Sequence, residues 1–182
     1  MSKAVLISIR PKWCELIASG KKTIEVRKTA PKIKTPFKCY IYCTKEGRGV
    51  GEIPYRHFYQ APDGPRHFMG GSVIGEFICD RIYGIVPDEN GWGEEYGYSE
   101  HDCLSDAEMA AYLGDHIGFG WHISNLVIYD EPKKLKEFEV FRTEHVTRKA
   151  YFQEGVCDEI VHVRTLVPLE RPPQSWCYVE EV

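Results

Sequence analysis

The sequence predicts an α+β domain, built as a small mixed β-barrel with two or three short helices. Many short segments are rich in β-branched residues and alternate between apolar and polar positions, as strands do. Two other segments carry clear helix start and stop signals, and many short strands with few helices favour a barrel. The 182 residues, 43% of them hydrophobic, are enough for one domain with its own core.

The first elements are strand, helix and strand. Residues 3–9 form the first strand, with Val5, Ile7 and Ile9 on one face. Pro11 suits the first turn of a helix over 11–19, and Gly20 suits its end. The alternating run 22–28 is the second strand.

The later segments of the sequence carry less regular patterns of apolar and polar residues. Ser105 and Glu108 match a capping box, which starts a helix that ends at Gly114. The segment 45–71 is interpreted as a long excursion between strands, and 139–171 has no clear assignment apart from one strand at 160–167. The remaining predictions are a loop at 29–36, strands at 37–44, 75–83, 120–129 and 175–179, an acidic connection at 87–102, and one helical turn at 133–138.

Charge is unevenly distributed along the chain. The net charge is −4, which argues against a protein that coats nucleic acid. Residues 1–50, however, hold twelve Lys/Arg and three acidic residues, so they carry +9 and the other 132 residues carry −13. This segregation indicates either a basic face for an anionic ligand or a lysine-rich solvated surface.

Seven cysteines without regular spacing indicate a reduced, cytoplasmic protein rather than a disulfide framework. Strand alternation places Cys39 and Cys43 on one face, where they are interpreted as small buried hydrophobes rather than zinc ligands. We therefore expect no metal and no cofactor. No apolar run is long enough to span a membrane, so no membrane partner is expected.

The run Gly20-Lys-Lys-Thr-Ile-Glu-Val-Arg27 matches Gly-x-Lys-x-x-Glu-x-Arg, the hallmark of the activating-signal-cointegrator homology (ASCH) domain. The sequence resembles this family, and in particular a bacterial and phage branch of it, over most of its length. Further similar blocks are Gly75-Glu-Phe, Gly120-Trp-His-Ile-Ser124 and Pro173-Gln-Ser-Trp-Cys-Tyr178.

The resemblance implies a single ASCH domain over 1–182, with insertions at about 45–71 and 139–165. It implies a β-barrel of the PUA-like group with a pocket between the barrel and the first helix. It also implies single-stranded or structured RNA, or a modified nucleoside, as the partner.

Strand alternation suggests how the motif residues are arranged. If Val5, Ile7 and Ile9 together with Ile24 and Val26 fill the barrel, the opposite faces form a basic cleft. Arginine can bind phosphate and a carboxylate can accept the amine of cytosine. The alternative, which the residues favour when the family is left aside, is a structural ion pair between Glu25 and Arg27. The predicted binding residues in this cleft are Ser8, Arg10, Lys22, Glu25 and Arg27.

Tryptophans supply a candidate platform for a stacked base. Trp121, together with Ser124, is the first choice, and Trp176 is a further candidate. Trp13, on the predicted helix, is assigned to packing.

A hydrolase is the alternative function. Some relatives are amidohydrolases that act on acetylcytidine with a Lys and a Thr of this motif and a Glu from elsewhere. Lys22 matches the Lys, but Glu25 occupies the Thr position, and Thr23 is one residue off on the same predicted face. Glu108 is a further carboxylate, and His122 is an acid or base for a metal-independent ribonuclease.

A third hypothesis is an adaptor that binds another protein. Its surface would be the 45–71 segment, which carries His57, Arg66 and His67.

Overall fold

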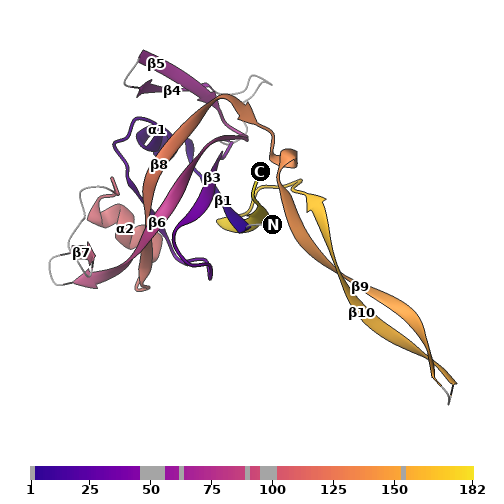
Figure 1. The fold of residues 1–182 in the computed structure, drawn as a ribbon. Helices are drawn as coiled ribbons and strands as arrows, with labels where there is room; N and C mark the ends of the chain where they lie inside the picture. Colours follow the sequence, from indigo (N-terminus) through magenta and orange to yellow (C-terminus); the bar gives the residue numbers. More distant parts are fainter. Residues whose placement is uncertain (1–2, 46–55, 62–63, 89–90, 95–101, 153–154) are drawn as a thin grey trace.

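The computed structural model describes residues 3–45, 56–61, 64–88, 91–94, 102–152 and 155–182. Within these ranges it is mostly β, with two α-helices and one 3-10 turn (Figure 1). The elements are β1 (Lys3–Ile9), α1 (Pro11–Ala18), β2 (Ile24–Arg27), β3 (Phe37–Cys43), β4 (Arg56–Ala61), β5 (Gly64–Met69), β6 (Ser72–Asp88), β7 (Gly91–Glu94), α2 (Asp106–Leu113), β8 (Gly118–Lys133), η1 (Leu135–Glu137), β9 (Glu139–Phe152), β10 (Gly155–Pro168) and β11 (Trp176–Glu180).

One curved sheet organises the body of the molecule. Its strand order is β11-β1-β3-β6-β8-β2, with β7 paired to the end of β6. Strands β1 and β3 are parallel, and the other neighbours are antiparallel. In the described residues the edge strands β2 and β11 share no backbone ladder, so barrel closure stays a prediction.

Side chains nevertheless connect the two ends of this sheet. Arg27 on β2 donates to Ser175 Oγ, next to β11, at 3.5 Å. Trp176 Nε1 donates to Thr29 Oγ1 at 3.0 Å, just after β2. The curvature therefore brings the first and last strands of the sheet close together.

The two helices begin and end where their sequence signals predicted. Pro11 occupies the start of α1, and Gly20 follows its end with φ at +73°, which a glycine adopts without strain. Ser105 caps α2, and its capping box with Glu108 is complete.

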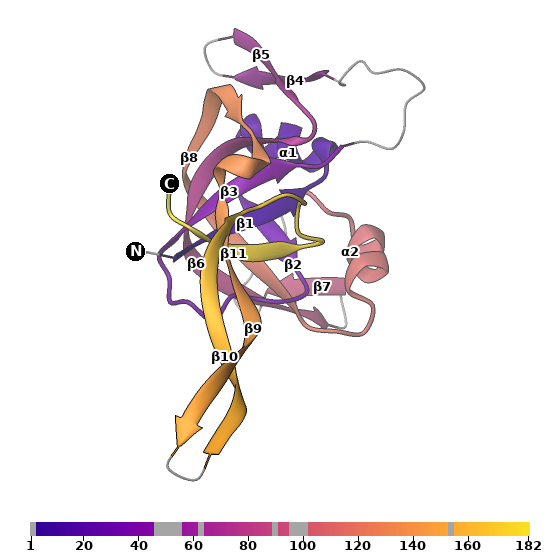
Figure 2. The same ribbon diagram turned by 90° about the vertical axis from the view of Figure 1, so that its right-hand side faces the viewer.

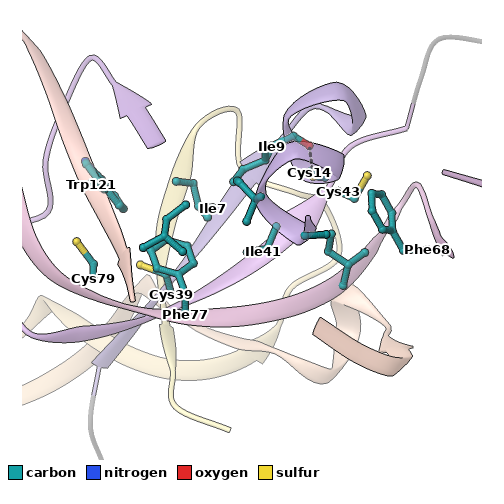
Figure 3. Packing of buried hydrophobic residues seen from close by; sticks show 14 of the residues in the cluster. Ile7, Ile9, Cys14, Cys39, Ile41, Cys43, Phe68, Phe77, Cys79 and Trp121 are labelled. Carbon is teal, nitrogen blue, oxygen red and sulfur yellow. Dashed lines mark hydrogen bonds between the residues drawn. The ribbon is translucent and has the colours of Figure 1, made fainter. Parts of the chain in front are cut away.

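The main core lies inside the curve of the sheet, against α1. As expected, Val5 of β1 belongs to this core, together with Ile7 and Ile9 of β1 and Cys39 and Cys43 of β3 (Figure 3). A second cluster on the other face of β1 and β3 contains Leu6, Tyr40 and Phe138. Because these strands are covered on both sides, nearly all their residues are buried.

The predicted orientation of β2 is wrong. Glu25 lies opposite Trp121 on β8, and directly paired residues share a face. Trp121 belongs to the main core, whereas Val26 packs outside it with α2 residues Met109 and Leu113. Glu25 and Arg27 therefore point into the curve of the sheet, and the apolar residues of β2 point outward to α2.

Two segments that the sequence left largely unassigned form hairpins, and the predicted strand at 160–167 is confirmed as part of β10. Within 45–71, β4 pairs with β5 and lies over α1, while residues 46–55 are outside the described residues. Within 139–171, β9 and β10 pair along their whole length and extend away from the body (Figures 1 and 2). No helix in the described residues is long and apolar enough to cross a membrane.

Gly75→Ala is expected to destabilise the sheet strongly. A Cβ at this buried position in β6 would collide with the backbone carbonyl of Val127 and approach Ile128 Cα to 3.1 Å. Backbone atoms in a central strand pair cannot shift without breaking the strand pairing. We therefore expect the free energy of unfolding to fall by about 1–3 kcal/mol or more, since this is the usual cost of overpacking a core. Urea unfolding measures it, and an unchanged midpoint would contradict the close β6–β8 approach.

Candidate functional site

Lys22, Glu25 and Arg27 form one buried charged cluster. Lys22 Nζ lies 3.6 Å from Glu25 Oε2, and Arg27 Nη2 lies 2.9 Å from Glu25 Oε1. The three side chains are between 1% and 8% exposed. The structure thus brings together the three fixed charges of the sequence motif, but inside the sheet rather than in an open cleft.

Local structure explains how each member reaches the cluster. The turn after α1 is held by the Lys22 amide, which donates to the Leu16 carbonyl at 3.0 Å. Glu25 and Arg27 follow two residues apart on β2, so they share one face. The arrangement therefore follows directly from the helix–turn–strand sequence.

Arg27 links the cluster to the first and last strands. Its Nη2 donates to the Ser8 carbonyl at 2.7 Å, and its Nη1 reaches Ser175 Oγ. The Ser8 hydroxyl points elsewhere and donates to the Pro173 carbonyl at 2.7 Å. Ser8 thus contributes its backbone to this site, not its side chain.

Asp102 is a neighbour of the cluster that sequence reasoning missed. Lys22 Nζ donates to the Asp102 carbonyl, 80 residues away in the chain. Burial raises the pKa of the Asp102 carboxyl, although Lys22 and the Leu104 amide oppose that shift. No local signal marks Asp102, because only the fold places it over Lys22.

Trp121 is not an exposed platform. Its ring is fully buried and packs edge-on against Phe37 and at a tilted angle against Trp176, with ring centroids 5.9 Å apart in both pairs. The correction follows from the orientation of β8, which points residue 121 into the core. Trp121 Nε1 and Arg27 Nε are buried donors that have no acceptor in the described part of the chain.

Trp13 lies at the edge of the charged cluster and is only partly buried. Its ring lies 5.2 Å from Lys22 Nζ and 4.3 Å from Lys12 Nζ, measured to the ring centroid. Trp13, which the sequence analysis assigned to packing, is thus the residue whose ring lies next to Lys22 of the motif.

In the described structure, the other candidates make no side-chain hydrogen bond or ion pair with the cluster; they are the predicted binding residues Arg10, Ser124 and Trp176 and the candidate catalytic residue Thr23. Arg10 is exposed at the start of α1, and Ser124 Oγ donates to the Ile78 carbonyl at 2.8 Å within the sheet. Trp176 is partly buried and bonds Thr29. Thr23 is partly buried before β2, and its carbonyl accepts from the Ile123 amide.

His122 forms a pair with Asp80 on the outer face. His122 Nδ1 lies 2.6 Å from Asp80 Oδ1, and both side chains are more than one third exposed. The hydrogen bond to His122 lowers the pKa of Asp80. Asp80 and Arg81 lie where the β6–β8 register shifts, between Cys79 and Ile82, and such irregularities are common near functional sites.

Two other candidates have structural roles. Glu108 accepts from Ser105 and pairs with Lys12 at 2.9 Å, which lowers the pKa of Glu108 to about 2. His57, expected on a protein-binding surface, is buried and lies 3.2 Å from Glu15. Arg66 bonds Asp130, and His67 is exposed.

A shallow hollow of about 350 Å³ lies between the end of α1, the β4–β5 hairpin and β8. Its lining includes Ser19, Tyr59 and Leu126 but none of the cluster residues. In the described residues no group of three or more His, Cys, Asp and Glu side chains is arranged to hold a metal ion.

Alkylation should rank the cysteines by burial. Burial raises the pKa of Cys79 to about 12 and that of Cys177 to about 11, so both stay protonated at pH 8. Cys157 is exposed on β10. With iodoacetamide, mass spectrometry should find Cys157 modified first, and equal rates at the three sites would contradict this burial.

The comparisons with known proteins agree with this architecture. Residues 7–61 match the ASCH domain family model. The crystal structure of ASCH from Zymomonas mobilis is 22% identical and covers 72% of this chain and 73% of its own, with a TM-score of 0.50. A serine-to-alanine mutant of it is 18% identical and covers 98% of this chain and 89% of its own, with a TM-score of 0.54. No curated protein matches the chain.

Proposed function

We propose, from the premise that residues 7–61 belong to the ASCH domain family, that this protein binds RNA or a modified nucleoside at the Lys22–Glu25–Arg27 cluster. The observation that carries the proposal is a pair of buried donors, Arg27 Nε and Trp121 Nε1, on the same face as a buried carboxylate. Buried donors are normally satisfied, so these two point to an acceptor supplied by a ligand.

The polar pattern suits the edge of a cytosine-type base. Such an edge presents one amine donor followed by two acceptors, and an acylated amine keeps one N–H. Glu25 keeps free lone pairs beyond its two cation contacts, so it can accept from the amine. Arg27 Nε and Trp121 Nε1 then donate to the acceptors.

We infer that a ligand enters beside the partly buried Trp13 and displaces the contact that Lys22 makes. The Lys22 ammonium is bonded to the Asp102 carbonyl, an acceptor that a phosphate or base oxygen can replace. Trp13, beside Lys22, takes the role of the aromatic platform that was predicted for Trp121. The exposed Lys12 and Lys21 add positive charge around this entrance.

Calorimetric titration with cytidine, acetylcytidine, uridine and short single-stranded RNA tests the proposal. We expect cytidine-type ligands to bind more tightly than uridine, with RNA affinity that falls as salt rises. Lys22→Met should weaken binding at least tenfold, whereas Lys136→Met, a change of an exposed lysine in η1 outside the proposed site, should leave it within twofold. Equal binding by both variants, or no base preference, would place the site elsewhere.

A second candidate, cleavage of an RNA linkage, is favoured by the His122–Asp80 pair. The Asp80 carboxylate at Nδ1 orients the ring and leaves Nε2 as the base for a ribose hydroxyl. Incubation with labelled single-stranded RNA should give product that is lost in His122→Ala but kept in His116→Ala, a substitution of an exposed histidine away from the pair. No turnover at high enzyme concentration would exclude this candidate.

A further inference from the structure

The β9–β10 ribbon is a two-stranded arm that leaves the body of the molecule. Its base contacts β11 and η1, and the rest projects away from the body in both views (Figures 1 and 2). Residues 141–149 are all exposed, so this part of β9 is held mainly by its pairing with β10. A two-stranded hairpin alone is marginally stable in water. A cross-link between the two strands would therefore have a large effect on the order of the arm.

Two histidines face each other across the middle of this ribbon. His145 on β9 is the direct partner of His162 on β10. Directly opposite residues of an antiparallel pair lie on one face, with Cβ atoms about 4.5–5.5 Å apart. The two ring centroids are 4.6 Å apart, and both side chains are exposed. Both imidazoles are thus presented to solvent at one point of the same face.

The separation of the two rings matches that of a pair of imidazoles bound to one metal ion. A divalent transition metal binds an imidazole nitrogen at about 2.0–2.1 Å, which places the ion about 3.2 Å from the ring centre. Two rings that meet the ion at an angle of about 90–110° then have centres about 4.5–5.2 Å apart. The observed 4.6 Å lies within this range, so rotation of the exposed rings suffices to aim one nitrogen of each at a common ion.

Neither ring is engaged with another side chain by a polar contact. In the part of the chain that the structure describes, His145 and His162 have no hydrogen bond or ion pair. The cation two residues after His162 on the same face, Arg164, lies 4.5 Å from the ring centroid of Phe141. Phe141 is nearer the base of the ribbon, so the guanidinium points away from the two imidazoles. No positive charge of this pair of strands therefore lies between the rings.

The register keeps other possible ligands away from the two rings. Glu144, Cys157 and Glu159 lie on the opposite face of the ribbon. Asp158 shares the face but is four residues from His162, about 13 Å along the strand. The site thus offers two nitrogen ligands, which suit Cu²⁺, Ni²⁺ and Zn²⁺, whereas Mg²⁺ and Ca²⁺ prefer oxygen ligands.

We propose that His145 and His162 bind one divalent transition-metal ion between them, and that this ion cross-links β9 to β10 at the centre of the ribbon. Water completes the coordination shell, because the two side chains supply only part of it. The ion binds the paired strands more tightly than separated ones, so it shifts the ribbon toward its ordered state. The site is independent of the Lys22–Glu25–Arg27 cluster and of any activity there.

Calorimetric titration of the full chain with NiCl₂ tests the site, with MgCl₂ as the comparison. We expect the wild type to bind one Ni²⁺ per chain and no Mg²⁺. His145→Ala and His162→Ala should each weaken Ni²⁺ binding at least tenfold, because two linked ligands bind roughly 10²–10⁴ times more tightly than one. His116→Ala, the loss of an exposed histidine outside the ribbon, should leave the affinity within twofold. A wild type that binds no Ni²⁺ up to about 1 mM, or equal effects of all three variants, would overturn the proposal.

Exchange of two neighbouring residues tests the cross-link at constant composition. The double change His145→Val and Val146→His moves one imidazole to the opposite face of the ribbon and should lower Ni²⁺ affinity as much as the single variants do. Bound Zn²⁺ should slow hydrogen exchange of the amides of 142–149 at least tenfold in the wild type and leave it unchanged in the exchanged variant. Hydrogen exchange without metal shows whether each variant keeps the ribbon. Full Ni²⁺ affinity in the exchanged variant, or no slowing with Zn²⁺ bound to the wild type, would contradict the cross-link.

Discussion

Glu25→Ala is expected to lower the free energy of unfolding by about 3–5 kcal/mol, the usual cost of removing one partner from a buried ionic cluster. Glu25 is the carboxylate that faces both Lys22 and Arg27, and all three side chains are almost fully buried. Without it, two cations remain in a region of low dielectric with fewer polar contacts. Urea unfolding monitored by fluorescence measures the loss.

Two comparisons make this result specific. Glu131→Ala removes an exposed carboxylate from β8 and should change stability by less than about 0.5 kcal/mol, the usual effect of a surface substitution. The triple change Lys22→Met, Glu25→Leu and Arg27→Met removes all charges together and should recover most of the stability. If the triple variant is as unstable as Glu25→Ala, packing rather than charge holds this region together.

The triple variant also separates stability from function. Under the proposed function it should fold but fail to bind nucleosides, because the polar groups that contact the base are gone. A cluster with only a structural role predicts that binding, if present, survives. The result therefore distinguishes the two interpretations that the sequence left open for Glu25 and Arg27.

Much of the fold could be predicted because its local signals agree with its tertiary contacts. The strand at 3–9, the helix begun by Pro11 and the capping box at Ser105 all correspond to elements of the structure. The strands around 75–83 and 120–129 were found but underestimated, because β6 and β8 continue beyond the core into exposed residues. The predicted strand at 160–167 lies within β10, but β9 and its pairing with β10 were missed, since the ribbon has no fully buried face to produce a regular alternation.

The residues of the charged cluster were predicted from the sequence, but the direction in which their side chains point was not. Alternation correctly separated Ile24 and Val26 from Glu25 and Arg27 on β2. It could not show which set points inward, because α2 covers the outer face and gives the apolar residues a second place to pack. A strand buried on both faces carries no sequence signal of its direction.

Aromatic residues were misassigned for the same reason. Trp13 lies on a helix and Trp121 on a strand, and both suit a core by composition. Only the placement of β8 shows that Trp121 is enclosed, while Trp13 lies beside Lys12 and Lys22. The ring closest to the motif lysine is thus the one that sequence reasoning set aside.

Trp121→Ala is expected to lower the free energy of unfolding by about 3–5 kcal/mol, as large-to-small changes of buried aromatic residues do. Trp121 is fully buried, contacts Phe37 and Trp176, and lies opposite Glu25. Its removal leaves a cavity between β8 and both ends of the sheet. Urea unfolding measures this loss.

Trp121→Phe tests the role of the Nε1–H donor separately from the packing of the ring. Phenylalanine keeps most of the packing and removes Nε1–H, a buried donor with no acceptor among the described residues. An unsatisfied buried donor costs about 1–3 kcal/mol, so its removal offsets part of the lost packing and the variant should be close to wild type in stability. Binding of cytidine should nevertheless fall several-fold, because a ligand acceptor loses its donor. Loss of stability equal to that of Trp121→Ala would contradict this account, because it would mean that Nε1 already has a partner within the folded chain.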